Sequence, residues 1–226
     1  DQTLAQRLRV RMGKEGEFRL LGHLDLVRLL DRVVRRASLP IRFSGGYHPG
    51  PRIMVANALS LGMTSSGEVV DFELTEVMEV EAFKTQLAAQ LPSEMPIYSV
   101  EDVDPKSPSA NKLLRQAEYV LDVAVAEGEA DWQGWIDQIL AITEVLFEKT
   151  TKSGKKKQVN LRDRLFTLTV ETSTPETAKL HFLGSCQNDG TTLRPEQLVG
   201  MFESVVGQAV ELLHAHRVQL VLAESP

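Results

Sequence analysis

Residues 44–51 constrain the fold of this chain more than any other stretch, because they cannot form a helix or a strand. They read Ser-Gly-Gly-Tyr-His-Pro-Gly-Pro, are followed by Arg52, and hold three glycines and two prolines. This composition predicts a stiff loop between two strands. Its Tyr47, His48 and Arg52 suit stacking on a base and gripping a phosphate. In the structural alternative, the loop is a crossover whose Tyr47 packs on the core.

A helix is expected just before this loop, over residues 22–37. Its apolar residues recur at spacings of three and four and predict a buried stripe made of Leu24, Val27, Leu30, Val33, Val34 and Ala37. An acidic residue in the first turn and two arginines in the last turn suit the helix dipole. Pro40 ends the helix.

The first hundred residues predict the element order β-α-β-β-α-β, with one extra strand. Strands are expected at residues 7–12, 18–21, 41–43, 52–59, 68–74 and 97–103, and a second helix at 79–91. This order is typical of the split βαβ, or ferredoxin-like, pattern. We expect an antiparallel sheet with both helices on one face and the other face open to a partner or a second domain. Strict alternation over residues 7–12 places Arg7, Arg9 and Arg11 on the outward side of that strand.

A linker rich in proline and serine, at residues 104–110, precedes a second set of elements. Strands are expected there at 119–126, 145–150, 165–170, 180–183 and 218–222, and helices at 132–140 and 194–214, with Trp135 as a core anchor. We therefore predict an α+β protein of two ferredoxin-like (split βαβ) halves with mainly antiparallel sheets. Residues 1–104 form the N-terminal half with the basic surface and the Gly/Pro loop, and residues 105–226 form the C-terminal α+β half.

Charge is distributed unevenly along the chain. Residues 1–62 hold 11 Lys and Arg against 5 Asp and Glu, whereas residues 63–226 hold 14 against 26. A basic quarter on an acidic body favours an anionic partner such as RNA, although solvated helix faces give the same count. No apolar run approaches the roughly 18 residues that span a bilayer, so we expect no membrane partner and no signal peptide. The single cysteine, Cys186, excludes a disulfide framework and favours a reducing, cytoplasmic location.

The predicted nucleic-acid contacts combine the loop with basic residues elsewhere in the chain. A hairpin tip at residues 151–157 carries four lysines. It suits a clamp on a phosphate backbone, or else it blunts a sheet edge. The residues predicted to bind nucleic acid are Arg11, Arg19, Tyr47, His48, Arg52, Lys155, Lys156 and Arg162.

Two histidines are the candidates for acid–base chemistry: His23 at the start of the expected helix and His48 in the loop. Together with Asp25 they offer the ligand types of a metal site. Positions two apart do not share a helix face, however, so we predict no metal. No Ser-His-Asp order and no Cys-His pair stands out. The sequence therefore assigns no catalytic residue.

Two segments resemble a known bacterial family. Residues 18–28 read Phe-Arg-Leu-Leu-Gly-His-Leu-Asp-Leu-Val-Arg, and residues 43–53 read Phe-Ser-Gly-Gly-Tyr-His-Pro-Gly-Pro-Arg-Ile. With residues 59–63 and 67–73, they resemble the radical-SAM-linked proteins, an uncharacterised family whose pattern includes F-L-S-H-L-D-L-x-R and G-F-N-P-H-P-K-I. The resemblance covers most of the chain and is specific over about the first 75 residues. The motif positions that it marks are His23, Asp25, Tyr47, Pro49, Pro51 and Arg52.

Members of that family are encoded beside a radical SAM protein or fused to its C-terminal end. The resemblance implies that the iron–sulfur cluster and SAM belong to the linked domain, because the cluster needs three cysteines and this chain has one. A chain that opens with Asp1 instead of Met fits the fused form. Gly50 stands where the family has a His, so a catalytic role of that His cannot apply here. Asn160 stands where the family has an Asp, which weakens a metal site at that position.

Three functions follow from these observations. The leading hypothesis is a non-catalytic accessory domain of a radical SAM protein that binds RNA or presents a substrate. The second is a metal-independent endoribonuclease, by analogy with the tandem ferredoxin-like nucleases that process CRISPR repeats. In it, His23 or His48 serves as acid or base and Arg52 stabilises charge. The third is a docking module that binds a protein through the open sheet face.

Overall fold

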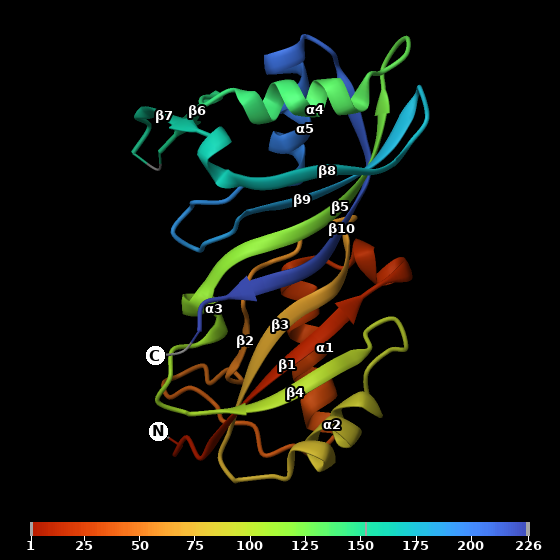
Figure 1. The fold of residues 1–226 in the computed structure, drawn as a ribbon. Helices are drawn as coiled ribbons and strands as arrows, with labels where there is room; N and C mark the ends of the chain where they lie inside the picture. Colours follow the sequence, from red (N-terminus) through yellow and green to blue (C-terminus); the bar gives the residue numbers. More distant parts are fainter. Residues whose placement is uncertain (1, 152, 225–226) are drawn as a thin grey trace. The chain divides into compact units, whose positions relative to one another are not determined.

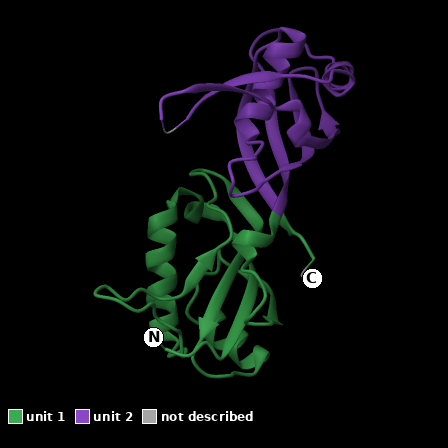
Figure 2. Cartoon of the chain, turned by 90° about the vertical axis from the view of Figure 1, so that its left-hand side faces the viewer, with its two compact units in different colours: residues 1–114, 219–226 green, residues 115–218 purple. Residues whose placement is uncertain are grey.

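A computed structural model describes residues 2–151 and 153–224 of the chain. The chain divides into two compact units: unit 1 holds residues 1–114 and 219–226, and unit 2 holds residues 115–218 (Figure 2). The predicted boundary at residue 104 lies ten residues before the division at 114. The sequence also did not predict that the last residues of the chain belong with unit 1.

Unit 1 contains the predicted β-α-β-β-α-β order. Its elements are β1 (Gln6–Lys14), the 3-10 helix η1 (Gly16–Leu20), α1 (His23–Arg36), β2 (Ile53–Val55), β3 (Thr64–Leu74), α2 (Val80–Ala88), β4 (Ile97–Val103) and α3 (Ala110–Leu113). β1 pairs antiparallel with both β3 and β4, and β2 pairs antiparallel with β3. The strand order within the unit is therefore β4-β1-β3-β2.

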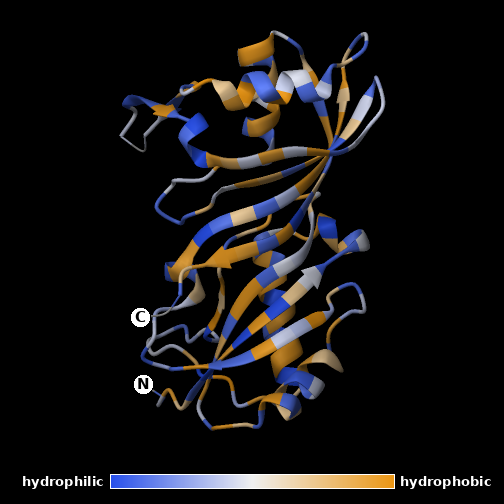
Figure 3. Ribbon diagram, viewed as in Figure 1, coloured by the Kyte–Doolittle hydropathy of each residue, from blue (hydrophilic) through white to orange (hydrophobic). Residues whose placement is uncertain are grey.

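Both long helices of unit 1 cover the same face of its sheet, as predicted. The core joins the inward side chains of β1 and β3 to the apolar faces of α1 and α2: Leu8, Val10, Met12, Leu26, Leu30, Val33, Val34, Val70, Phe72, Leu74, Phe83 and Leu87. Along the strands, hydrophobic and hydrophilic bands alternate (Figure 3). The prediction that Leu24 belongs to the buried stripe is wrong: Leu24 is 70% exposed, because the buried row of α1 starts at Leu26.

Two predicted strands of unit 1 are not strands. Most of residues 18–21 lie in η1, where the N–H of Leu21 bonds the carbonyl of Phe18 three residues earlier. Residues 41–43 make only isolated bridges, Ile41 to Leu74 and Phe43 to Pro51. Pro40, just before this segment, and Pro51, opposite Phe43, lack the backbone donors that a longer ladder would need.

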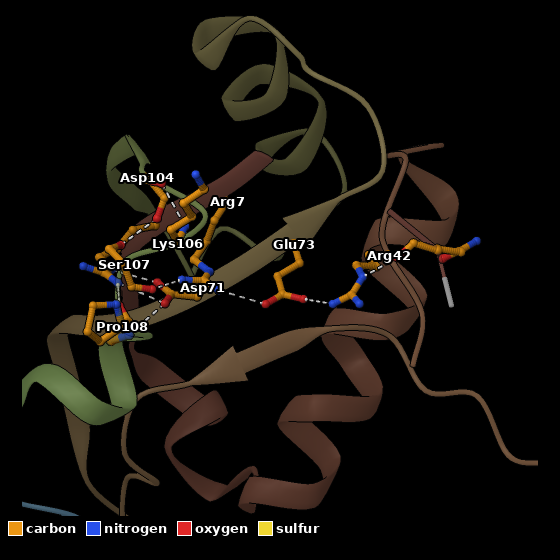
Figure 4. A network of polar contacts seen from close by, with 11 residues as sticks. Arg7, Arg42, Asp71, Glu73, Asp104, Lys106, Ser107 and Pro108 are labelled. Atoms are coloured by element: carbon orange, nitrogen blue, oxygen red, sulfur yellow. Dashed lines mark hydrogen bonds and ion pairs between the residues drawn. The ribbon is translucent and has the colours of Figure 1, made fainter. Parts of the chain in front are cut away.

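Part of the opposite face of the unit 1 sheet is covered, whereas the prediction left this face open; Ser99 and Glu101 of β4 stay exposed there. Arg7 and Arg9, expected to point to solvent, form ion pairs with Glu73 and Asp71 of β3, at 3.1 and 2.8 Å. Figure 4 shows the pair of Arg7 with Glu73. Glu73 also pairs with Arg42 at 2.7 Å. These ion pairs neutralise arginines that the alternation predicts to be solvent-exposed on the outward side of β1.

The predicted linker packs onto this charged face. The carbonyls of Ser107 and Pro108 accept hydrogen bonds from Arg7 (2.6 Å) and Arg9 (3.3 Å). The backbone N–H of Ala110 donates to Asp71 at 2.8 Å. The linker is therefore an ordered part of unit 1, which explains why the division between the units follows it.

Unit 2 contains β5 (Leu114–Val125), α4 (Trp132–Ala141), β6 (Leu146–Thr150), β7 (Lys156–Asn160), the 3-10 helix η2 (Arg162–Arg164), β8 (Leu165–Ser173), β9 (Thr177–Ser185), α5 (Pro195–Val206) and most of β10 (Val210–Leu222). β6 and β7 form a separate two-stranded sheet. All other strands pair in the order β4-β1-β3-β10-β5-β9-β8, with β2 on β3. The protein is thus α+β with a large mixed, mostly antiparallel sheet (Figure 1).

The core of unit 2 centres on aromatic side chains of its two helices. Trp132, Trp135 and Phe202 contact one another with ring centroids 5.5 to 6.4 Å apart, which confirms Trp135 as a core anchor. The predicted helix 194–214 is too long. α5 ends at Val206 because Gly207 adopts a left-handed conformation, with φ of 76°. β10 then starts at Val210.

Within the described residues, no helix is both long enough and apolar enough to cross a membrane. Cys186 is buried next to the end of β9.

Candidate nucleic-acid interface

The loop at residues 44–51 is closed at its base by backbone and side-chain hydrogen bonds. The N–H of Ser44 donates to the carbonyl of Gly50 at 2.9 Å, and the N–H of Gly50 donates to the hydroxyl of Ser44 at 3.0 Å. Beside them, Phe43 and Pro51 form a bridge. The motif position Pro51 therefore helps to close the loop. The exposed tip is held by a short, stiff base.

The tip of the loop presents an aromatic pair to solvent. Tyr47 is 94% exposed, so the alternative in which it packs on the core is wrong. Its ring meets the ring of His48 edge-to-face, with centroids 4.8 Å apart. The neighbouring Pro49 is exposed, and Gly46 has a φ of 106°, which a residue with a side chain rarely adopts. The backbone thus keeps both rings away from the core.

One arginine of α1 lies at the base of this loop, and another directly precedes β2. The guanidinium carbon of Arg35, in the last turn of α1, lies 4.9 Å from the ring centroid of Phe43 at the loop base. Arg35 also pairs with Asp31 at 2.8 Å. Arg52 is exposed, and within the described part of the chain no ion pair involves it. Arg52 is therefore an exposed cation that directly follows the loop and pairs with no carboxylate among the described residues.

Two other predicted contacts on unit 1 lie on different elements and have partners. Arg11 of β1 is half-buried and donates to the carbonyl of Leu220 at 3.2 Å. It lines a cavity of about 420 Å³ together with Glu101 and Glu224, two acids that oppose phosphate binding. Arg19 of η1 pairs with Glu17 at 3.1 Å. The loop, and not these arginines, is the least neutralised basic surface among the predicted contacts of unit 1.

The predicted contacts of unit 2 lie around the β6–β7 hairpin. Lys155 is exposed, and Lys156 is exposed and pairs with Glu148 at 2.9 Å. Lys152, in the same predicted tip, lies outside the described residues.

Arg162 has a structural role in place of the predicted phosphate contact. Its guanidinium donates to the carbonyls of Ile139, Leu140 and Leu165 at 3.0 to 3.1 Å. It thereby satisfies two carbonyls at the C-terminal end of α4. A lone arginine between two expected elements gives no sequence signal for this role.

His23 and Asp25 lie at the start of α1, and both are exposed. Asp25 pairs with Arg28 at 3.1 Å. In the part of the chain that the structure describes, no group of three or more His, Cys, Asp or Glu side chains could hold a metal ion, and His23, Asp25 and His48 do not form one. A catalytic role of His23 or His48 stays a hypothesis from the sequence.

Asn160, a departure from the family pattern, closes the base of the β6–β7 hairpin. Its side-chain oxygen accepts hydrogen bonds from the N–H groups of Val145 (2.9 Å) and Arg162 (3.1 Å). Its side-chain nitrogen donates to the carbonyl of Thr143 at 3.0 Å. An ionised Asp has no donor for the bond to Thr143. The hydrogen bonds of this position therefore require an amide side chain.

Comparison with solved structures shows a likeness of fold. The fold is similar to part of Cbf5. A chain of a Cbf5–Nop10–Gar1 complex matches with a TM-score of 0.56 at 8% identity, over 94% of this chain and 48% of that chain. A chain of the archaeal box H/ACA sRNP Nop10–Cbf5 complex matches with a TM-score of 0.50 at 9% identity, over 94% and 47%. The chain therefore spans about half the length of these solved proteins.

Residues 7–195 match a family described as an uncharacterized protein conserved in bacteria, DUF2344, and the chain belongs to this family. A search of curated proteins gives no match.

Proposed function

We propose that this chain is an accessory domain that binds RNA through the loop surface, defined as Tyr47, His48 and Arg52, and that it presents RNA or another substrate to a radical SAM protein. The observation that carries the proposal is the 94% exposure of Tyr47 at the tip of a loop whose base is closed by hydrogen bonds. A large aromatic side chain gains nothing from such exposure in the isolated chain. Its exposure is expected if a planar group stacks on it.

The chemistry of this surface suits single-stranded RNA. Stacking of a base on an aromatic side chain contributes about 1–3 kcal/mol and tolerates any base. Arg52 adds a cation for a phosphate, and His48 offers a second ring and a hydrogen-bonding group. Because the base of the loop is already ordered, binding costs less conformational entropy than it would for a flexible segment.

The architecture supports the same proposal. We interpret unit 1 as a ferredoxin-like unit, because its β-α-β-β-α-β order and its strand order β4-β1-β3-β2 fit the split βαβ pattern. In unit 2, β5, α4, β8, β9, α5 and β10 follow the same order, with the β6–β7 hairpin inserted, and the strand order β10-β5-β9-β8 is equivalent. The similar fold in a protein of an archaeal sRNP, a ribonucleoprotein, is compatible with RNA as the ligand.

The radical SAM link rests on the sequence resemblance. Under this proposal the chain is not itself the catalyst. The iron–sulfur cluster and SAM reside on the linked domain, because that cluster needs three cysteines and this chain has one.

The test is the salt dependence of binding to bulk tRNA, measured by fluorescence anisotropy from 50 to 200 mM salt. We expect a linear fall of log K with log salt. The variant Tyr47→Ala/Arg52→Ala should lose about tenfold or more in affinity and reduce the slope by about one phosphate contact. Tyr47→Phe should retain binding because the ring remains.

The matched control is Phe166→Ala/Lys84→Ala, which likewise removes one aromatic ring and one cation, from β8 and α2; the Phe166 side chain is 48% exposed. It should bind within about twofold of the wild type. The proposal fails if the wild type does not bind tRNA at the lowest salt, or if both double variants lose the same affinity.

A further inference from the structure

A groove on unit 2 lies between the β6–β7 hairpin and α5. It has a volume of about 300 Å³, and one wall consists of Val145, Leu146, Phe147 and Leu161. Leu146 and Phe147 are 51% and 43% exposed. Because alternate and directly paired residues share a face, Val145, Phe147 and Leu161 lie on one side of the hairpin and Leu146 on the other, so the exposed apolar side chain on the groove side is Phe147. We call this feature the α5 groove.

The other wall is one face of α5. Glu196, Gly200 and Ser204 line it at a spacing of four residues, and Met201 contributes its buried floor. A Cβ added at Gly200 would meet nothing within 4 Å, so the groove is open there. Glycine inside a helix costs roughly 0.5–1 kcal/mol relative to alanine. The helix thus carries a residue that weakens it and keeps the groove clear.

The hairpin adds a positive edge to this apolar groove. Phe147 pairs with Val159, and Lys149 pairs directly with Lys157. Directly paired and alternate residues of a hairpin share a face, so Phe147, Lys149 and Lys157 lie on the same side. Two like charges opposite each other destabilise the hairpin unless an anion lies between them. The carboxylate of Glu148 lies on the other face, paired with Lys156.

We propose that the α5 groove binds an amphipathic helix of a protein partner, with apolar side chains between Phe147 and Gly200 and acidic side chains over Lys149 and Lys157. Helices bind such grooves through apolar anchors spaced three or four residues apart. The apolar walls require apolar anchors, and the lysine pair requires negative charge beside them. The apolar walls also favour a peptide over nucleic acid, because a phosphate backbone carries no apolar anchor to place against Val145, Phe147 and Leu161.

This inference does not rest on the loop surface, which lies on unit 1.

The probe is a synthetic helical peptide of about 18 residues, long enough to be partly helical alone. It carries Leu at i, i+3, i+4 and i+7 positions and Glu elsewhere. A second peptide replaces every Glu with Lys. Binding is measured by amide shifts of the isotopically labelled full chain, with tRNA as a competitor.

We expect the acidic peptide alone to bind and to shift the amides of Phe147 and Gly200. Gly200→Leu should weaken it by about tenfold or more, because the new side chain fills the groove. Leucine is also a better helix former than glycine, so this variant should fold. The matched control Gln138→Leu adds the same side chain to an exposed position of α4, away from the groove, and should bind normally.

Charge reversal gives the sharpest test. Lys149→Glu/Lys157→Glu keeps a like-charge pair, and hence the local repulsion, but should bind the basic peptide in place of the acidic one. The proposal is overturned if neither or both peptides bind the wild type. It is also overturned if tRNA shifts the same amides and displaces the peptide, which makes the groove a nucleic-acid site. Self-association of the chain that Gly200→Leu abolishes assigns the groove to a second copy instead.

Discussion

At the scale of single residues, Asp71 determines how the charged face of unit 1 is satisfied. Its side chain is fully buried and accepts two hydrogen bonds from Arg9, at 2.8 and 3.1 Å, and one from the N–H of Ala110 at 2.8 Å. Each of these donors points at an ionised carboxylate. A buried charge with this many partners is stable only while all of them remain.

Asp71→Asn should therefore lower the free energy of unfolding by about 3–5 kcal/mol, because an amide group would face the guanidinium of Arg9 and leave it uncompensated. Urea unfolding followed by circular dichroism measures the loss. Glu17→Gln is the control, since it breaks an exposed ion pair and should change stability by less than about 1 kcal/mol. Equal midpoints for the two variants would show that the buried pair does not stabilise unit 1.

At the scale of elements, polar groups join α4 to the base of the β6–β7 hairpin, beside the buried Val145 and Leu161. Arg162 bonds carbonyls of the last turn of α4, and Asn160 joins the two ends of the hairpin. β6 is exposed along its whole length, and a two-stranded hairpin is marginal by itself. The hairpin therefore depends on these few bonds.

Arg162→Ala should destabilise unit 2 by about 2–4 kcal/mol, because several buried carbonyls lose a charged donor. Both tryptophans of the chain lie in α4, so their fluorescence reports the unfolding of this unit. Lys155→Ala, on the same hairpin, should change stability by less than about 0.5 kcal/mol. The folded variant should also keep the wild-type salt slope for tRNA. If the slope of log K against log salt falls by about one in this variant, Arg162 does contact a phosphate, as the sequence predicts.

At the scale of the whole molecule, the chain returns to unit 1 at its end. Leu220 is 1% exposed, its carbonyl accepts a hydrogen bond from Arg11, and the N–H of Ala223 donates to the carbonyl of Leu113 at 2.7 Å. The end of β10 thus completes unit 1, although some two hundred residues separate it from β1. A contact of such sequence separation forms late and at a large entropic cost.

Leu220→Ala should cost about 2–5 kcal/mol, because it leaves a cavity in a buried site. The effect should appear in unit 1 as faster amide hydrogen exchange of β3, measured by mass spectrometry. Leu213→Ala is a matched control on the same strand, since that side chain is 54% exposed and its loss should be tolerated. Unchanged exchange in β3 after the Leu220 substitution would show that β10 does not stabilise unit 1.

Much of the local structure was predictable from the sequence. The strand expected at 97–103 matches β4 residue for residue, and the helix expected at 22–37 differs from α1 by one residue at each end. These elements are encoded by short-range periodicity, which any segment carries by itself. The stiff loop was also predictable, because its glycines and prolines exclude regular structure whatever surrounds them.

The same local patterns misplaced residues wherever distant contacts determine the environment. Alternation assigned Arg7 and Arg9 to solvent, but Glu73 and Asp71 lie more than sixty residues away and convert this side of β1 into a buried ion-pair network. The sequence predicts Arg162 as a phosphate contact, but its guanidinium donates to carbonyls at the end of α4. The sequence around these arginines does not indicate which groups accept their hydrogen bonds.

The sequence by itself determined the class of the fold, the positions of most elements and the loop that carries Tyr47, because periodicity and backbone stereochemistry act over a few residues. Only the tertiary structure decided which charges are neutralised by ion pairs within the chain, which apolar side chains stay exposed and to which unit the end of the chain belongs. The physical reason is that ion pairs, burial and strand pairing depend on groups brought together from distant parts of the chain. Both proposals rest on groups of this kind: Arg52, which forms no ion pair among the described residues, and Phe147, which stays 43% exposed.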